Sequence, residues 1–171
     1  MATTGLFFGS NGGATEDVAQ RIASHMGEVD IFSISKKNVD EIRKYKIVIF
    51  GTSTMGVGDL QDDWQAVFSQ LDNVDLSDTT VALFGLGDQE GFSDTFLDGM
   101  GILHEKVAER GAHLVGRWNQ NGYDFIESAA MVDGAFVGLA LDEENQPDLT
   151  DERILKWVEQ LKTEISKGEQ P

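Results

Sequence analysis

The sequence predicts a doubly wound α/β fold, in which helices cover both faces of a parallel sheet. Apolar runs that suit strands alternate along the chain with apolar stripes at helical spacing. Two of the runs, at 47–50 and 81–84, are apolar at every position, as expected of parallel strands buried on both faces. Three glycine-rich segments each follow an apolar run. In such folds, ligands bind outside the carboxyl ends of the strands.

The first half of the chain predicts three strands and two helices. Strands are expected at 6–8, at 29–34, where the alternating pattern indicates more exposure, and at 47–50. The apolar stripe of the first helix, which Gly27 ends, consists of Val18, Ile22 and Met26. The stripe of the second helix consists of Trp64, Val67, Phe68 and Leu71.

The second half predicts a fourth strand at 81–84 and a fifth that begins at 114–115. A polar stretch at 118–135 lacks a helical period, and a strand resumes at 136–141. The third helix, closed by Gly111, has the stripe Phe96, Met100, Leu103 and Val107. The last helix, with Thr150 as its expected N-cap, has the stripe Ile154, Trp157, Val158, Leu161 and Ile165. We expect a single domain over residues 1–171.

Composition excludes several classes of function. The net charge of −17 would repel a nucleic-acid backbone or an anionic membrane and favours a basic protein partner. The chain has no cysteine, which excludes disulfides, thiolate catalysis and cysteine-bound clusters. We find no signal peptide and no apolar stretch of about 18 residues, so a reducing cytoplasm is the expected compartment. Carboxylates crowd the glycine-rich segments: Asp59, Asp62, Asp63, Asp88, Glu90, Asp94 and Asp98.

The first glycine-rich segment predicts an anion site. It consists of Ser10, Asn11, Gly12, Gly13, Ala14 and Thr15. Glycines let backbone N–H groups turn inward, and the following helix N-terminus favours negative charge. No lysine or arginine lies between Gly9 and Val18, which argues against a nucleotide-hydrolysing loop, and the dinucleotide fingerprint is absent. A phosphate held by neutral donors remains, and an ordinary tight turn is the alternative.

The second and third segments favour a flat ligand. The second consists of Thr52, Ser53, Thr54, Met55, Gly56, Val57 and Gly58. Its last two glycines permit close approach of the main chain or a conformational change, although a flexible connection explains them as well. The third spans residues 85–92, and its candidate ligand contacts are Gly85, Leu86, Gly87, Asp88 and Phe92. Phe92 either stacks on a ring or begins the core stripe of the third helix.

Other catalytic or metal sites are not indicated. His25, His104 and His113 lack the spacing of metal ligands, and no serine, histidine and aspartate combination suggests a nucleophilic site. No metal site is therefore expected.

The combined motifs resemble the flavodoxins, and in particular the long-chain flavodoxins. The resemblance covers about residues 4–166 and rests on the three segments above, in order, with Gln61 and Trp64 after the second. The stretches 121–125 and 136–146 are similar to the long-chain members in particular. In that group the irregular stretch at 118–135 is an insertion of about 20 residues that splits the fifth strand.

The resemblance implies a five-stranded parallel sheet in the order 2-1-3-4-5 and one non-covalently bound FMN. The first segment would hold the FMN phosphate, the other two would flank the ring, and Asp88 would lie near its pyrimidine end. The protein would be a low-potential one-electron carrier, shuttling between semiquinone and hydroquinone with no substrate of its own. The peptide joining Gly56 and Val57 would flip to accept the proton at flavin N5.

Three positions depart from the family pattern. The usual threonine is Gly12, the usual inner tryptophan is Met55, and the usual outer tyrosine is Phe92. We expect these changes to weaken FMN binding. Met55 still offers a sulfur contact to a ring, worth about 0.3–1.5 kcal/mol.

Two other functions occur on such a fold. An FMN-dependent quinone or NAD(P)H oxidoreductase needs a substrate pocket over the ring and is usually a dimer, whereas we expect a monomer. A phosphorylation-dependent receiver needs an aspartate at the end of the third strand, where this chain has 51–53, Gly-Thr-Ser. The partners that the family implies are basic-surfaced redox proteins: ferredoxin–NADP⁺ reductase, photosystem I, nitrogenase reductase or radical-enzyme activation systems.

Overall fold

A computed structural model describes residues 3–37 and 39–169 and has the predicted doubly wound α/β architecture. Four strands form the centre of a parallel sheet in the order β2 (Val29–Ser33), β1 (Thr4–Phe8), β3 (Ile47–Met55) and β5 (Thr80–Leu86). β3 pairs with β5 from Ile47↔Thr80 to Ser53↔Leu86. Residues 47–50 and 81–84 are apolar at every position, and all but Ile47 are buried, as expected of parallel strands covered on both faces.

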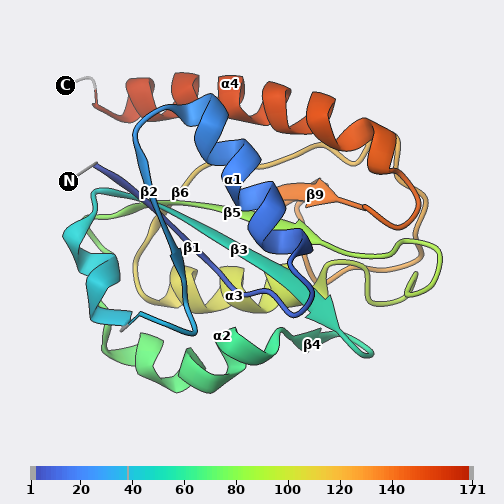
Figure 1. The fold of residues 1–171 in the computed structure, drawn as a ribbon, viewed down its shortest axis with the longest axis horizontal. Helices are drawn as coiled ribbons and strands as arrows, with labels where there is room; N and C mark the ends of the chain where they lie inside the picture. The colour runs from blue at the N-terminus through green and yellow to red at the C-terminus, as the bar shows by residue number, and fades with distance from the viewer. Residues whose placement is uncertain (1–2, 38, 170–171) are drawn as a thin grey trace.

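Helices pack on both faces of the sheet (Figure 1). α1 (Ala14–Met26) and α4 (Thr150–Glu169) cover one face, and α2 (Asp62–Val67) and α3 (Asp98–Glu109) cover the other. Each packs its predicted stripe against the core, with Val18 and Ile22 of α1 fully buried and stripe members such as Val67 of α2 partly buried. The carboxyl ends of β1, β3 and β5 consequently open at one edge of the sheet.

The fifth strand is split, as the resemblance implies. β6 (His113–Leu114) pairs with the first half of β5, and β9 (Leu139–Leu141) pairs with its second half. Between them, β7 (Met131–Val132) and β8 (Ala135–Phe136) form a small antiparallel hairpin. The expected strand at 136–141 is therefore wrong at its start, because Phe136 pairs with Met131 and the chain enters the main sheet only after Gly138.

The insertion is anchored by aromatic side chains. Tyr123 and Phe125 pack against Phe96 and Phe136, with ring centroids 5.2–6.1 Å apart. The Tyr123 hydroxyl accepts a hydrogen bond from Trp118 Nε1 at 2.9 Å and donates one to the Ala140 carbonyl. Burial raises the pKa of Tyr123 to about 12. The insertion lies on the surface, and its aromatic side chains fasten it to the core.

Three expected element boundaries differ from the structure. Thr150 is not an N-cap, because the turn η3 (Pro147–Leu149) leads straight into α4 and Thr150 already has helical angles of −59° and −48°. The second helix ends at Val67 and continues as a 3₁₀ helix, η2 (Phe68–Asn73). Phe96 is fully buried but precedes α3. In these three helices the apolar period predicts which side chains face the core. It does not predict the residue at which each helix begins or ends, because the backbone hydrogen bonds at the helix ends set that boundary.

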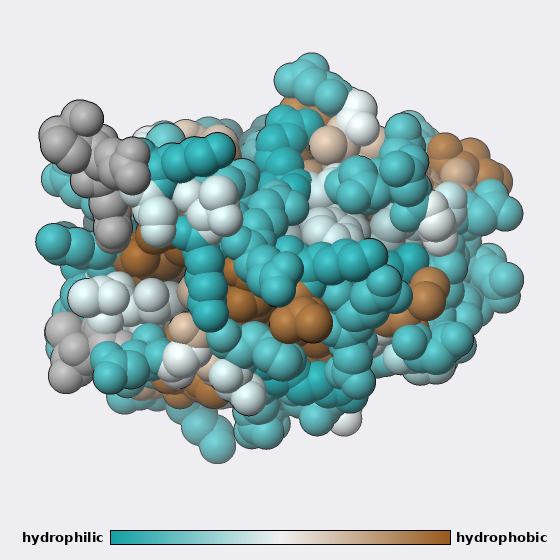
Figure 2. Space-filling view, turned by 90° about the horizontal axis from the view of Figure 1, so that it is seen from above, coloured by the Kyte–Doolittle hydropathy of each residue, from teal (hydrophilic) through white to brown (hydrophobic). Residues whose placement is uncertain are grey.

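The surface over α1 and α4 is mainly hydrophilic, with small separate hydrophobic areas (Figure 2). Within the described residues, no helix combines the length and apolar character needed to span a membrane. The remaining helical segment, η1 (Val39–Lys44), connects β2 to β3.

We predict that Gly138→Ala destabilises the fold. A Cβ at this position would lie 2.1 Å from the Leu83 carbonyl oxygen, inside the pairing between β5 and β9. Because backbone must move, we expect a loss of at least about 2 kcal/mol in the free energy of unfolding, measured by urea denaturation. Gly168→Ala in α4 is the control, since a Cβ there is 3.9 Å from His113 Nε2. An equal, small effect of both substitutions would contradict the prediction.

Candidate functional site

The loops after β1, β3 and β5 surround one pocket at the carboxyl edge of the sheet. Its volume is about 250 Å³. Its wall consists of Ser10, Asn11, Gly12, Ala14, Thr15, Ser53, Thr54, Leu86, Gly87, Asp88, Phe92, Thr95, Phe96, Leu97, Glu143 and Glu144. One end of the wall is the start of α1, and the other is largely apolar. The pocket lies where the sequence placed a ligand.

The first loop presents an open helix N-terminus to this pocket. Gly13 precedes α1 with φ of +88°, and no side chain of the described residues caps the first turn. The Gly13 N–H donates to Ser10 Oγ at 2.9 Å, which folds the loop on itself. A Cβ on Gly12 or Gly13 would meet nothing within 4 Å, so the loop faces open space. Unpaired N–H groups and the helix dipole favour an anion here.

Gln61 holds this loop from behind. Its side chain is fully buried, and its Oε1 accepts hydrogen bonds from the N–H groups of Asp63 and Trp64, which caps α2. Its Nε2 donates to Asn11 Oδ1 at 2.6 Å. Gly9 is required beside it, because a Cβ there would lie 2.0 Å from Gln61 Oε1. One buried amide therefore joins the first loop to α2.

Carboxylates also contact the first loop. Asn11 Nδ2 donates to Asp62 Oδ2 at 3.0 Å, and the Ser10 N–H donates to Asp63 Oδ2 at 3.4 Å. Among the described residues, the pocket wall contains no lysine, arginine or histidine. An anion at this loop would thus be held by neutral N–H and hydroxyl groups, as the sequence predicts.

The second loop is shorter than expected. β3 continues through Met55 and forms a hairpin with β4 (Asp59–Leu60), so the segment is a tight β-turn between strands and not a strand-to-helix connection. Gly56 and Gly58 in this turn have φ of +50° and +84°, which favour glycine. The Val57 side chain is 78% exposed at the tip of the turn. The sequence pattern missed the hairpin because β4 has only two residues.

The third loop is organised by Asp88. Its Oδ1 accepts hydrogen bonds from the N–H groups of Glu90 and Gly91 and from Asn145 Nδ2. The Gly91 N–H, together with the Asn145 amide, holds the pKa of Asp88 below its usual value. Phe92 belongs to the pocket wall and precedes α3, so the structure favours the wall position over the start of the helix.

A second buried polar side chain, Asp142, supports the third loop. Its Oδ2 accepts from the N–H and the side-chain amide of Gln89, and its Oδ1 accepts from the N–H groups of Glu144 and Asn145. Gln89 Oε1 in turn accepts from the Asp124 N–H at 2.7 Å. The loop after β5, the loop after β9 and the insertion are therefore linked through one carboxylate.

Not every expected site residue reaches the wall. Those outside it are Gly13, Thr52, Met55, Gly56, Val57, Gly58 and Gly85. Thr52 is buried and donates to the Ser53 carbonyl, and a Cβ on Gly85 would meet Met100, so both lie beneath the pocket. The wall residues that the sequence did not indicate are Thr95, Phe96, Leu97, Glu143 and Glu144. Periodicity assigned Phe96 to a helix, and no sequence signal places the loop after β9 beside the first loop.

An uncapped helix N-terminus at one end and Leu86, Phe92 and Phe96 at the other fit a ligand with a phosphate and a flat apolar part. The fold and the pocket together define a doubly wound α/β protein whose pocket suits a phosphate-bearing ring compound. Residues 6–157 match the family model described as Flavodoxin. The chain belongs to the flavodoxin family.

Close relatives support this assignment over almost the whole chain. The chain is 48% identical over 163 residues to the flavodoxin of Nostoc sp. strain PCC 7120, covering 94% of this chain and 96% of that protein. It is 41% identical over 168 residues to flavodoxin 1 of Escherichia coli, covering 96% of each chain. A crystal structure of Fusobacterium nucleatum flavodoxin bound to flavin mononucleotide has 33% identity and a TM-score of 0.91, with coverage of 96% and 99%.

We predict that Gln61→Leu lowers stability by about 1–3 kcal/mol, because it removes the α2 cap and leaves a buried N–H at Trp64 without its acceptor. Urea denaturation of the apoprotein measures this loss. Gln65→Leu, at an exposed position of the same helix, is the matched control and should change stability little. Equal effects at both positions would show that Gln61 is not the anchor of the first loop.

Proposed function

We infer that this protein is a low-potential one-electron carrier that works with non-covalently bound FMN. The observation that carries the inference is the pocket itself, which has an open helix N-terminus at one end and an aromatic wall at the other. The Fusobacterium relative of the same fold was crystallised with flavin mononucleotide. When bound, FMN supplies the redox chemistry, because it accepts and releases electrons singly.

The first loop is the proposed phosphate site. The backbone N–H groups at the start of α1 and the hydroxyls of Ser10 and Thr15 are its donors. Gly12 offers no hydroxyl where the family usually has threonine, so the backbone carries more of the binding here. Ser10 already orients the loop through its hydrogen bond with Gly13.

The second and third loops are the proposed ring site. Phe92 supplies a flat apolar surface, and Met55, whose sulfur lies 4.0 Å from Ser53 Oγ, supplies a polarizable one. We assign the carbonyl of Gly56 as the acceptor for the N–H that the cofactor gains on reduction. Glycine allows the Gly56–Val57 peptide to change its orientation at low cost, since both signs of φ are accessible to it.

Local charge explains a low potential. Asp88 and Glu144 line the pocket, and the whole chain has a net charge of −17. A second electron on bound FMN would place negative charge among these groups, and two unit charges several ångströms apart repel by about 1–4 kcal/mol at a surface-like dielectric constant. The hydrogen bonds to Asp88 keep this carboxylate charged and in place.

The partners are redox proteins, as for other flavodoxins. We propose that they carry basic surfaces, because an acidic carrier is then steered toward them in a salt-dependent manner. Ferredoxin–NADP⁺ reductase, photosystem I, nitrogenase reductase and radical-enzyme activation systems are the candidates, with the cytoplasm as the compartment. Members of this family carry electrons and do not turn over a substrate of their own.

Stepwise anaerobic reduction of the purified protein tests the function. We expect a yellow protein that gains a transient long-wavelength absorption band before it bleaches, because the two electrons arrive at well-separated potentials. The visible spectrum after each addition of reductant is the measurement. Direct bleaching without the band, together with NAD(P)H–quinone turnover, would favour the oxidoreductase alternative.

We predict that Gly56→Val narrows the gap between the first and second midpoint potentials. A β-branched residue is strained at the observed φ of +50° and resists a change of peptide orientation. The loss of one net hydrogen bond to the reduced cofactor corresponds to a change of about 20–65 mV in a one-electron midpoint potential. Potentiometric titration measures the gap, and Gly134→Val is the control, since Gly134 has φ of +84° in the hairpin turn between β7 and β8. An unchanged gap in Gly56→Val would contradict the assignment of the Gly56 carbonyl.

A further inference from the structure

The pocket poses an electrostatic problem at its phosphate end. Glu143 and Glu144 belong to the same wall as the first loop, and among the described residues that wall holds no cationic side chain. The first loop brings no cationic side chain either, because the sequence has no lysine or arginine between Gly9 and Val18. A phosphate dianion that enters this pocket meets carboxylates, so one or more of them must be compensated from outside the wall.

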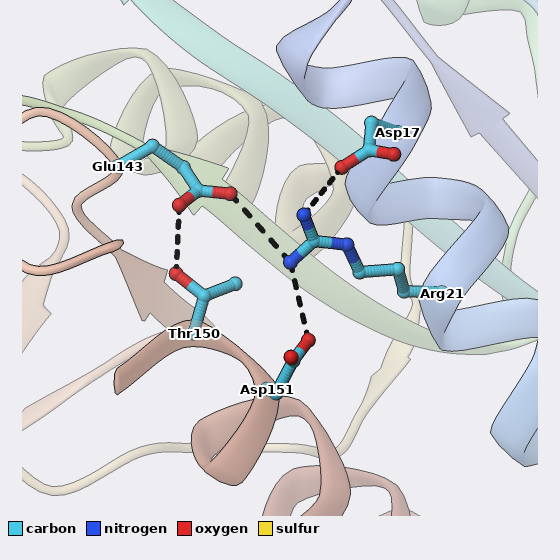
Figure 3. A network of polar contacts seen from close by, with 5 residues as sticks. All are labelled: Asp17, Arg21, Glu143, Thr150 and Asp151. Carbon is cyan, nitrogen blue, oxygen red and sulfur yellow. Dashed lines mark hydrogen bonds and ion pairs between the residues drawn. The ribbon is translucent and has the colours of Figure 1, made fainter. Parts of the chain in front are cut away.

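Arg21 supplies that compensation from α1 (Figure 3). Its Nη1 lies 3.7 Å from Glu143 Oε1 and 3.2 Å from Asp151 Oδ1, and its Nη2 lies 2.7 Å from Asp17 Oδ2. Of the ion pairs formed within residues 3–37 and 39–169, the pair with Glu143 is the one that includes a pocket-wall residue. The guanidinium thus connects α1, α4 and the loop after β9.

Glu143 is held from a second side. The buried Thr150 hydroxyl donates to Glu143 Oε2 at 3.0 Å, while Oε1 faces Arg21. Each carboxylate oxygen therefore has a fixed partner, and three-quarters of the side chain is shielded from solvent, with 24% exposed. Arg21, which also pairs with Asp17 and Asp151, offsets part of the charge of Glu143, and Arg21 and Thr150 together set the position of this side chain (Figure 3).

We propose that Arg21 is a positioning residue for phosphate binding in this pocket, which fixes Glu143 and offsets part of its charge so that a wall without cations accepts a phosphate dianion. Because the phosphate belongs to the cofactor assigned above, this role of Arg21 rests on the proposed function. Arg21 acts through Glu143 and touches neither the ring site nor the third loop. Its effect is therefore specific for the phosphate and sensitive to salt.

Titration of the apoprotein with FMN and with riboflavin, which lacks the phosphate, tests this role through quenching of flavin fluorescence. In Arg21→Gln we expect FMN binding to weaken about three- to tenfold at about 20 mM salt, because one carboxylate charge is uncovered near the dianion. At about 0.5 M salt the loss should fall below about twofold, since the screening length is then only a few ångströms. Riboflavin binding should stay within about twofold of the wild type under both conditions.

Matched variants separate charge from structure. Arg43→Gln removes the same charge from an exposed ion pair with Asp40 in η1 and should leave FMN binding unchanged. Arg21→Lys should recover most of the affinity, and Arg21→Gln combined with Glu143→Gln should restore it by removing the uncovered charge. Equal losses for FMN and riboflavin, or no recovery in the double variant, would overturn the role of Arg21. Unchanged FMN binding in Arg21→Gln would also overturn it, whereas a wild-type apoprotein that binds no FMN would refute the proposed function itself.

Discussion

The pairing of β3 between β1 and β5 is the interaction on which the rest of the structure depends. Because the three strands are parallel, their carboxyl ends meet at one edge, and three loops distant in sequence become neighbours. Hydrogen bonds connect the elements at this edge. The Gly51 carbonyl accepts one from the Gly9 N–H at 3.1 Å and another from Trp64 Nε1 at 2.9 Å. The first loop, α2 and the centre of the sheet therefore share one acceptor.

Behind the pocket, buried polar side chains make the loops rigid. Gln61 fixes the first loop and Asp142 fixes the third, and both are fully buried with several hydrogen bonds satisfied. A buried polar group of this kind is costly unless it is paired, and paired it specifies one arrangement. The front of the site differs, because Val57 and Phe92 are exposed there and the turn between β3 and β4 contains two glycines with positive φ. A buried polar support behind the pocket and an exposed rim in front of it suit an electron carrier, whose cofactor must be held firmly and still be reached by a redox partner.

The same acidic charge serves two purposes and creates one difficulty. In the proposed function it would steer the carrier toward basic partners and disfavour a second negative charge on the cofactor, which would make the reduced carrier a strong donor. It also repels the cofactor phosphate. The helix N-terminus of α1 offsets part of this repulsion, and the Arg21 contact with Glu143 offsets another part from outside the wall. Phosphate binding and low potential are therefore tuned by different residues of one charge distribution.

The sequence alone determined the fold class, the strand order through the family resemblance, and the three segments at the ligand edge. These follow from local patterns, since a doubly buried strand such as 81–84 and a glycine-rich turn leave signatures within a few residues. Only the tertiary structure decided the β3–β4 hairpin, the position of Phe136, the helical start at Thr150, and the places of Glu143, Gln61 and Asp142. The β3–β4 hairpin and the pairing of Phe136 with Met131 are local but too short to leave a periodic pattern. The places of Gln61 and Asp142 depend on contacts with Asn11 and Gln89, which are 50 and 53 positions away, and such contacts have no local signature.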